Sequence, residues 1–283
     1  MSLDIAQVLQ AAASSLSGHS ESPRLDAELL LSKILGMSRS GLVVHGAAPI
    51  AAARRVAYEQ LLQRRIDGAP IAYLTGTREF WSLNLSVTPD VLVPRPETEV
   101  LVELALGRMP ADSMTTVLDL GTGSGAIALA IASERPLARI TAVDVSPAAL
   151  AVAAGNARSL AAGNARIAWR LGSWFEPVSD LRFDVIVSNP PYVASTDPAL
   201  RSLTSEPLLA LAPGPSGLEA LSAIVAGAAR HLNSEGWLLL EHGSTQADEV
   251  AGLLDRHGFR NIRSHTDYAG KPRVTLGSHH SQP

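Results

Sequence analysis

The 283-residue chain contains no cysteine. This absence excludes disulfide bonds, thiolate metal sites and a thiol nucleophile. The eight histidines are scattered without the spacing of metal ligands, so the sequence predicts no metal site. Any chemistry must therefore come from oxygen and nitrogen groups of the chain or from a cofactor.

Strong charge and long apolar runs are missing as well. The formal net charge is −4 at pH 7, and charged residues make up 18% of the chain. Such a balance does not attract a polyanion, which weighs against direct nucleic-acid binding. No run approaches the roughly 18 consecutive apolar residues of a membrane span, and the first residues lack the pattern of a signal peptide. We therefore expect a cytoplasmic protein without a membrane partner.

Apolar residues make up 46% of the chain, and the length suffices for one large domain and a smaller one. The first 76 residues predict a small helical domain that docks a substrate. Apolar spacing there indicates helices over residues 5–16, 23–35, 49–67 and 70–76. Ser2 and Ser22 are the expected N-caps of the first two helices.

The periodicity changes after residue 76. Alternating apolar residues predict a β-hairpin linker over residues 77–96, and the prolines at its end close it. Strands and helices then alternate over residues 97–277, which predicts an α/β catalytic domain with a mostly parallel sheet. Its expected strands are 117–119, 140–143, 167–170, 185–188, 237–241 and 273–276, and its expected helices 126–134, 147–162, 218–232 and 246–257. Residues 278–283 are the expected flexible tail.

The tetrapeptide Asn189-Pro190-Pro191-Tyr192 is the most informative motif, and it directly follows a predicted strand. Two prolines make this loop rigid and remove two backbone donors, so its carbonyl groups are left as acceptors. The asparagine carboxamide adds an acceptor and the tyrosine ring a flat apolar wall. This combination favours a site that grips a planar NH2 group. Pro-Pro alone is typical of an ordinary rigid turn.

A glycine-rich loop, Gly121-Thr122-Gly123-Ser124-Gly125, lies between the first strand and its helix. Glycines permit a tight turn and close approach of a ligand, and the helix N-terminus offers free N–H groups. Asp144 follows about 20 residues later, where a carboxylate can accept hydrogen bonds from ribose hydroxyls. The loop fits a nicotinamide dinucleotide equally well. It can also be a purely structural turn, and Asp144 a helix cap.

Two further residues have two interpretations each. Asp119 stands just before the glycine loop, where it can orient that backbone or face a ligand's amino group. Trp174 follows the third strand and can stack on an adenine ring or fill the core.

Motifs along nearly the whole chain resemble those of the protein-(glutamine-N5) methyltransferase family that acts on peptide chain release factors. The more specific ones are Glu21-Ser22-Pro23-Arg24, Asp26-Ala27-Glu28, Pro70 to Gly76, Arg78-Glu79-Phe80-Trp81 and Pro94-Arg95-Pro96-Glu97-Thr98-Glu99. Those shared with many methyltransferases, or less specific, are Leu118 to Gly123, Asn189 to Tyr192 and Leu240-Glu241-His242-Gly243. One stretch departs from the family: the loop Leu203-Thr204-Ser205-Glu206-Pro207 is shortened.

The resemblance implies S-adenosyl-L-methionine as the cofactor and the class I methyltransferase fold, a Rossmann-like sheet of seven strands. It implies that the cofactor contacts Gly121, Thr122, Gly123, Ser124, Gly125, Asp144, Trp174 and Asn189. It also implies that Asn189, Pro190, Pro191 and Tyr192 bind the substrate glutamine, which lies in a Gly-Gly-Gln motif of the release factor. Asn189, Pro190 and Tyr192 are then the expected catalytic residues.

Other functions stay open at this point. An adenine-N6 methyltransferase acting on DNA or rRNA grips a similar amino group, although it favours a basic surface. A non-catalytic nucleoside-binding or scaffold protein retains the same fold. A nicotinamide-dependent oxidoreductase leaves the tetrapeptide unused.

Overall fold

The computed structural model describes residues 3–160 and 167–280. The chain divides into two compact units, Met1–Thr77 and Arg78–Pro283. The first unit ends one residue beyond the predicted helical domain, and the hairpin groups with the second unit. No helix among the described residues is long and apolar enough to cross a membrane.

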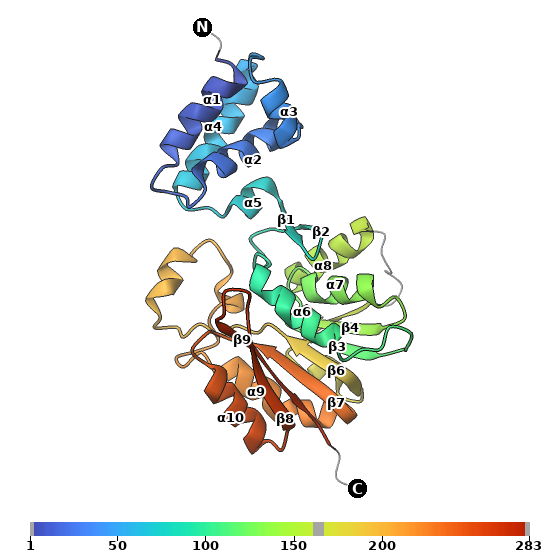
Figure 1. Cartoon of the computed structure of the whole chain (residues 1–283). Coiled ribbons are helices and arrows are strands. Elements are labelled where there is room, and N and C mark those ends of the chain that lie inside the picture. Colours follow the sequence, from blue (N-terminus) through green and yellow to red (C-terminus); the bar gives the residue numbers. More distant parts are fainter. Residues whose placement is uncertain (1–2, 161–166, 281–283) are drawn as a thin grey trace. The chain divides into compact units, whose positions relative to one another are not determined.

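The first unit is helical (Figure 1, blue). Its elements are α1 (Ile5–Ser15), α2 (Pro23–Leu35), α3 (Arg39–Val44), α4 (Ala52–Ile66) and α5 (Ile71–Thr75). Asp4, not the predicted Ser2, caps α1: its carboxylate accepts from the Gln7 amide at 2.8 Å. Ser2 lies outside the described residues. Gly36 ends α2 in the left-handed conformation, with φ of +67°.

The core of this bundle combines leucines with one buried ion pair. Leu30 and Leu31 are fully buried. Asp26, only 3% exposed, accepts from Arg65 Nε and from Ser20 Oγ, both at 2.7 Å. Tyr58 is buried beside them and donates its hydroxyl to the Ala27 carbonyl at 3.1 Å. The predicted 49–67 helix starts late, at Ala52.

The second unit begins with the hairpin and a short helical segment. These elements are β1 (Thr77–Phe80), β2 (Leu83–Ser86), η1 (Pro96–Thr98) and α6 (Glu99–Leu106). Trp81 and Ser82 connect the strands with φ of +52° and +57°. Two consecutive positive φ values give the turn that matches the twist of a hairpin.

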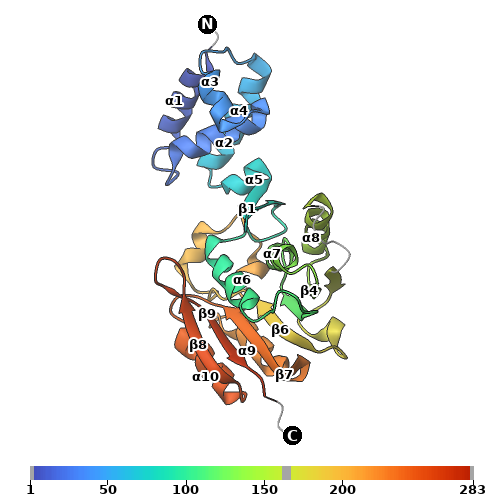
Figure 2. The ribbon, with the colours of Figure 1, turned by 45° about the vertical axis from the view of Figure 1, so that its right-hand side comes forward.

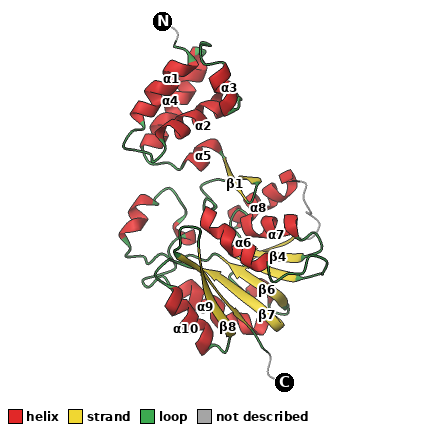
Figure 3. Ribbon diagram, viewed as in Figure 1, coloured by secondary structure: helices red, strands yellow, loops and turns green. Residues whose placement is uncertain are grey.

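The remaining elements alternate as predicted and form one twisted sheet, drawn in yellow in Figure 3. They are β3 (Thr116–Leu120), α7 (Ala126–Glu134), β4 (Arg139–Asp144), α8 (Pro147–Leu160), β5 (Ile167–Leu171), η3 (Glu176–Val178), β6 (Phe183–Ser188), η4 (Pro198–Ser202), η5 (Leu208–Ala210), α9 (Glu219–His231), β7 (Leu232–Glu241), α10 (Ala247–Arg256), β8 (Arg260–Thr266) and β9 (Pro272–Ser278). The seven strands lie in the order β5-β4-β3-β6-β7-β9-β8. Strands β3 to β7 run parallel, and β9 is antiparallel to both of its neighbours. This arrangement is the expected mostly parallel, Rossmann-like sheet.

Helices cover both faces of the sheet (Figure 2). Val117 and Val185 pack in a hydrophobic cluster with residues of α6 and α7. Their chain neighbours Leu118 and Ile186 point to the other face and pack with α9 and α10. Because both faces are covered, a ligand reaches the sheet only at a strand end.

Several elements differ from the sequence-based predictions, and β7 begins at Leu232, five residues before its predicted start. Strand β8 was not expected because its residues are mostly exposed and show no apolar alternation. Helix α3 was not expected either, and it buries only Leu42, so its sequence carries a weak helical signal. Helix α6 is also missing from the predictions, although its apolar residues follow a helical spacing that could have predicted it. Strand β9 runs to Ser278, which is buried and pairs with Trp237, so the predicted tail boundary lies too early. Residues 161–162 of the predicted helix and 281–283 of the tail lie outside the described residues.

Candidate active site

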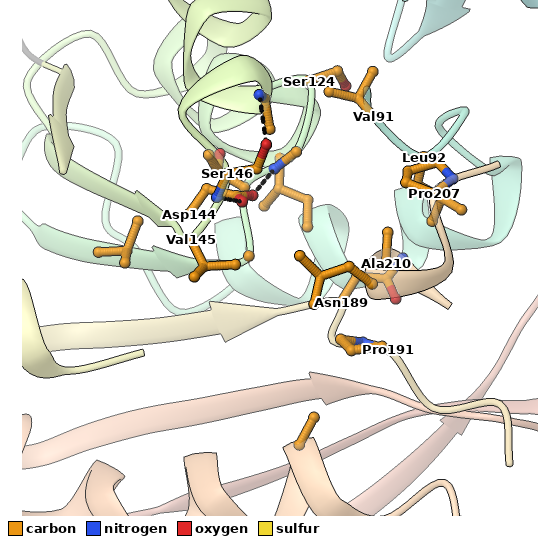
Figure 4. A pocket seen from close by; sticks show the side chains of 18 of the residues that line it. Val91, Leu92, Ser124, Asp144, Val145, Ser146, Asn189, Pro191, Pro207 and Ala210 are labelled. Atoms are coloured by element: carbon orange, nitrogen blue, oxygen red, sulfur yellow. Dashed lines mark hydrogen bonds between the residues drawn. The ribbon is translucent and has the colours of Figure 1, made fainter. Parts of the chain in front are cut away.

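A cavity of about 480 Å³ opens at the carboxyl ends of strands β3, β4 and β6 (Figure 4). Of the predicted site residues, it is lined by Gly121, Thr122, Gly123, Ser124, Asp144, Trp174, Asn189 and Pro191. A second, smaller cavity of about 90 Å³ shares Asn189 with it. The predicted residues Pro190 and Tyr192 line this smaller cavity. The two motifs thus come together at one edge of the sheet, as expected for parallel strands.

The glycine loop turns sharply between β3 and α7. Gly121 and Gly123 have φ of +72° and +55°, which favours residues without a Cβ atom. The amides of Gly121 and Thr122 both donate to the Val143 carbonyl, at 2.9 and 3.0 Å, and so tie the loop to β4. This geometry presents the loop backbone to the cavity.

Gly125 has a different surrounding from the rest of the loop. It does not line either cavity, and it has φ of +82°. A Cβ atom there would lie 3.1 Å from Ala153 and 3.2 Å from the Trp169 ring. The structure therefore gives Gly125 a packing role at the start of helix α7, and its predicted cofactor contact stays a prediction.

Asp144 ends β4 at the rim of the cavity (Figure 4). Its Oδ2 accepts from the Gly123 amide at 2.8 Å and its Oδ1 from the Ser146 amide at 2.9 Å. A carboxylate oxygen has two lone pairs, so both atoms can accept another hydrogen bond. Helix α8 is capped by Ser146 instead, whose Oγ accepts from the Ala149 amide at 3.1 Å. Asp144 is thus held both by the glycine loop and by the residue that caps helix α8.

Asp119 and Trp174 flank the same loop. Asp119 is fully buried, lines no cavity and accepts from the Thr122 hydroxyl at 2.6 Å, so it orients the loop. Burial raises the pKa of Asp119 to about 7. Trp174 is half-buried, lines the cavity and lies near Gly121, but also packs against the core cluster under α9. Trp174 thus lies at the cavity wall and against the core, and its stacking on an adenine ring stays a prediction.

The tetrapeptide leaves the end of β6, next to β3 and β7. Ser188, the last residue of β6, donates its hydroxyl to the Leu120 carbonyl at 2.7 Å. The Asn189 side chain donates through Nδ2 to Thr98 Oγ1 at 3.1 Å. With Nδ2 engaged in this bond, Oδ1 is left as the acceptor of the carboxamide.

Two buried residues from distant segments, Thr98 and Glu241, are hydrogen-bonded to the tetrapeptide, and neither is among the site residues predicted from the sequence. Thr98 holds Asn189, and Glu241 accepts from the Tyr192 hydroxyl at 3.4 Å. Burial raises the pKa of Glu241 to about 7 and also raises the pKa of Tyr192. Both Thr98 and Glu241 lie inside motifs of the family resemblance, which is the signal that could have found them.

The shortened loop is anchored to the segment after the hairpin. Glu206 is buried, accepts from the Val93 amide at 3.2 Å and forms an ion pair with Arg95. Arg95 lines both cavities, and Pro207 and Leu203 each line one of them. The loop therefore forms one wall of the site.

Comparison with known proteins shows the family of the chain. Residues 7–76 match the model of the PrmC N-terminal domain, and residues 98–215 match the methyltransferase small domain. The release factor glutamine methyltransferase of Salmonella typhimurium is 46% identical, covering 91% of this chain and 93% of that protein. The Aliivibrio fischeri protein of the same name is 43% identical over 98% of both chains. The chain belongs to the release factor glutamine methyltransferase family.

Solved structures show the fold of the second unit independently. A methyltransferase from Pyrococcus furiosus matches with a TM-score of 0.54 at 17% identity, covering 70% of this chain and 90% of that one. A Thermus thermophilus 16S rRNA methyltransferase, solved with S-adenosylmethionine and guanosine, also gives 0.54, at 19% identity over 72% of this chain and 49% of that one. The chain thus has the class I methyltransferase fold that the sequence predicted.

Proposed function

We propose that this protein transfers a methyl group from S-adenosylmethionine to the side-chain amide nitrogen (N5) of a glutamine in peptide chain release factors. The glutamine is that of the Gly-Gly-Gln motif. Family membership supports the reaction, and one observation carries the assignment of the site: Asn189 Nδ2 is occupied by Thr98, at 3.1 Å, which leaves Oδ1 to accept.

The residues around the larger cavity fit S-adenosylmethionine. A volume of about 480 Å³ is that of a small-molecule site. The glycine-loop backbone and the Asp144 carboxylate provide polar partners for the ribose and the methionine part, and Trp174 provides a flat wall for the base. When bound, S-adenosylmethionine supplies an electrophilic methyl group.

Asn189 and Pro190 meet the chemical difficulty of the reaction, which is that an amide nitrogen is a poor nucleophile. The Asn189 side-chain oxygen and the Pro190 carbonyl each accept one N–H of the substrate amide. Both acceptors are fixed beforehand, one by Thr98 and the other by the two successive prolines. As the nitrogen takes the methyl group it gains positive charge, and the two dipoles stabilise that charge. The surplus proton then passes from the nitrogen to water.

Pro191 and Tyr192 complete the notch. Pro191 borders the larger cavity and Tyr192 the smaller one, so the tetrapeptide spans the boundary between them. The Tyr192 ring packs on the plane of the substrate amide and helps to exclude water. Correct alignment of the two reactants supplies about 7–11 kcal/mol of the barrier reduction in such reactions.

The helical first unit docks the release factor in this proposal. Val43 and Val44 at the end of α3 are 74% and 78% exposed, although apolar side chains favour burial. The unit offers no metal-binding group among its described residues and no cavity residue, so it contributes surface rather than chemistry.

Mass spectrometry tests the proposed function. A release factor is incubated with the protein and S-adenosylmethionine, and its peptides are searched for a methyl group on the Gly-Gly-Gln glutamine. The expected result is one methyl group on that side chain, and none on a release factor carrying Gln→Ala at this position. Transfer of labelled methyl to DNA or rRNA, with none to the release factor, would instead support the adenine-N6 reaction.

A further inference from the structure

A chain of buried polar side chains lies directly behind the tetrapeptide. Glu241 is the last residue of β7 and is 1% exposed. Strand β7 pairs with β6 so that Leu240 lies opposite Ser188, which places Glu241 beside Asn189. Thr98, at the end of η1, is 4% exposed. These residues come from segments far apart in the sequence and meet only in the fold.

The hydrogen bonds in this chain have a defined direction. Asn189 donates through Nδ2 to Thr98 Oγ1 at 3.1 Å. Burial raises the pKa of the Glu241 carboxyl to about 7, and the nearby Thr98 side chain opposes this rise. A threonine hydroxyl has a single proton, which Thr98 can donate while its oxygen accepts from Asn189. The Tyr192 hydroxyl also donates to Glu241 Oε1, at 3.4 Å. Glu241 thus binds one end of the tetrapeptide directly, through Tyr192, and lies near Thr98, the partner of the other end.

Glu241 is poorly satisfied for a buried carboxylate. Its Oε2 has no donor with hydrogen-bond geometry among the described residues. The charged groups that face it are Arg273 on β9, itself held by Asp267 at 3.3 Å, and Glu97 on η1. Burial of an under-paired carboxylate costs free energy, and apolar residues fill such positions at least as well. Stability of the fold therefore does not account for this residue.

We propose that Glu241 is a positioning residue for methyl transfer, acting through Thr98 on Asn189 and directly on Tyr192. By accepting from Thr98, it makes Thr98 Oγ1 an acceptor for Asn189 Nδ2, and this keeps Asn189 Oδ1 turned to the substrate amide. By accepting from Tyr192, it fixes the ring that packs on the amide. The inference rests on the proposed function of the tetrapeptide.

The test compares Glu241→Gln, Thr98→Val and the double variant with the wild-type protein. Each single variant is expected to lower kcat by about ten- to a hundredfold, with the cofactor Kd changed less than about twofold. The double variant is expected to be no slower than the slower single variant, because both substitutions break the same chain. Thr98→Ser, which keeps the hydroxyl, is expected to restore most of the rate.

Thr275→Val is the matched control. Thr275 is a fully buried threonine on β9 whose hydroxyl is hydrogen-bonded to His242 Nε2 at 2.8 Å, and it lines neither cavity. We expect this variant to lower the Tm and to leave kcat unchanged. A merely structural Glu241 would behave in the same way, with a lower Tm and a normal kcat.

The pH profile gives a second readout. Glu241 must be ionised to accept from both donors, so the wild-type kcat is expected to rise with pH through about 7. Glu241→Gln is expected to remove this rise.

Several outcomes would overturn the inference. One is a kcat within twofold of wild type for folded Glu241→Gln. Another is a double variant whose loss of kcat equals the product of the two single losses. A third is a kcat of Thr98→Val equal to that of Thr98→Ser. If Glu241→Gln does not fold, the two Thr98 variants decide the matter alone. A wild-type protein that leaves the release factor unmethylated would overturn the proposed function as well, whereas a normal wild type with unaffected variants would overturn only the role of Glu241.

Discussion

The two units bury carboxylates in different ways. Asp26 in the helical unit is met at 2.7 Å by both Arg65 and Ser20. Glu241 in the catalytic unit has one hydrogen bond from a side chain, at 3.4 Å, and an oxygen without a partner. The first arrangement joins residues of the helical bundle, and the second is the one that we propose positions the tetrapeptide. We therefore interpret the well-paired carboxylate of Asp26 as part of the packing of the helical unit. We interpret the under-paired carboxylate of Glu241, at the end of a strand, as part of the candidate active site.

The same contrast extends to the other buried carboxylates. Among the described residues, the buried carboxylate oxygens without a hydrogen bond belong to Asp119, Glu219 and Glu241, all in the second unit. Asp119 is the second-last residue of β3 and Glu241 the last of β7, and these two strands flank β6, which leads into the tetrapeptide. The active-site edge of the sheet thus concentrates polar groups that the fold itself does not satisfy.

Asn189→Ala is expected to have the largest effect. Loss of one preorganised hydrogen-bonding group costs about 3–4 kcal/mol in comparable sites, so kcat should fall by about 10²–10³-fold while the cofactor Kd changes much less. Methyl-transfer kinetics and calorimetry measure the two quantities. Asn233→Ala is the matched control, because Asn233 donates to Asp184 at 2.7 Å and lines neither cavity. Near-normal turnover of Asn189→Ala would remove the assigned role.

Asp26→Ala tests the other side of the comparison. Arg65 would keep a largely buried charge without its partner, since its side chain is only 19% exposed. The expected loss of unfolding free energy is about 3 kcal/mol, measured by urea denaturation followed by circular dichroism. An unchanged denaturation midpoint would show that the pair contributes nothing to the bundle.

Much of the fold and of the candidate active site could be predicted from the sequence, and some of both could not. The central strands and the glycine loop follow from apolar runs and turn residues that need only local physics. Strand β8 escapes because its residues are mostly exposed. Local physics gives Thr98 and Glu241 no role, although both lie in motifs of the family resemblance. The pairing of Ser188 with Leu240 brings Glu241 beside Asn189, and the hydrogen bond from Asn189 brings in Thr98. Contacts set by long-range register carry no local signal.

Asp144→Ala is expected to weaken cofactor binding by about ten- to a hundredfold. The substitution removes the acceptor for the ribose and leaves the amides of Gly123 and Ser146 without their partner. Calorimetric titration with S-adenosylmethionine measures the Kd. Because Asp144 does not touch the tetrapeptide in the described contacts, kcat at saturating cofactor should fall far less than in Asn189→Ala. An unchanged Kd would favour the structural interpretation of Asp144.

Glu substitutions at Val43 and Val44 test the docking role of the helical unit. Charge on an apolar docking surface is expected to raise the KM for release factor by a few-fold and to leave kcat unchanged. Val56→Glu on α4 is the control, since Val56 is 51% exposed on another helix. If the Glu variants of Val43, Val44 and Val56 had the same KM for release factor, the exposed end of α3 would not be the docking surface.

The smallest expected effect is on the pH dependence of stability. The pKa values of Asp119 and Glu241 are raised to about 7, so the folded state holds their protons more tightly than the unfolded state does. Their contribution to stability is complete below the ordinary carboxyl range and is lost as the pH rises through about 7. Thermal unfolding of Asp119→Asn and Glu241→Gln should therefore show a flatter decline of Tm between about pH 4 and pH 7 than the wild type. Curves parallel to the wild type would contradict these pKa values.

A structure of the protein with S-adenosylhomocysteine and a glutamine-containing release-factor peptide tests the central claim most directly. We expect the glutamine amide nitrogen to lie about 2.7–3.2 Å from both Asn189 Oδ1 and the Pro190 carbonyl, in line with the cofactor sulfur. A glutamine bound through Asn189 Nδ2, or held away from the tetrapeptide altogether, would contradict the account.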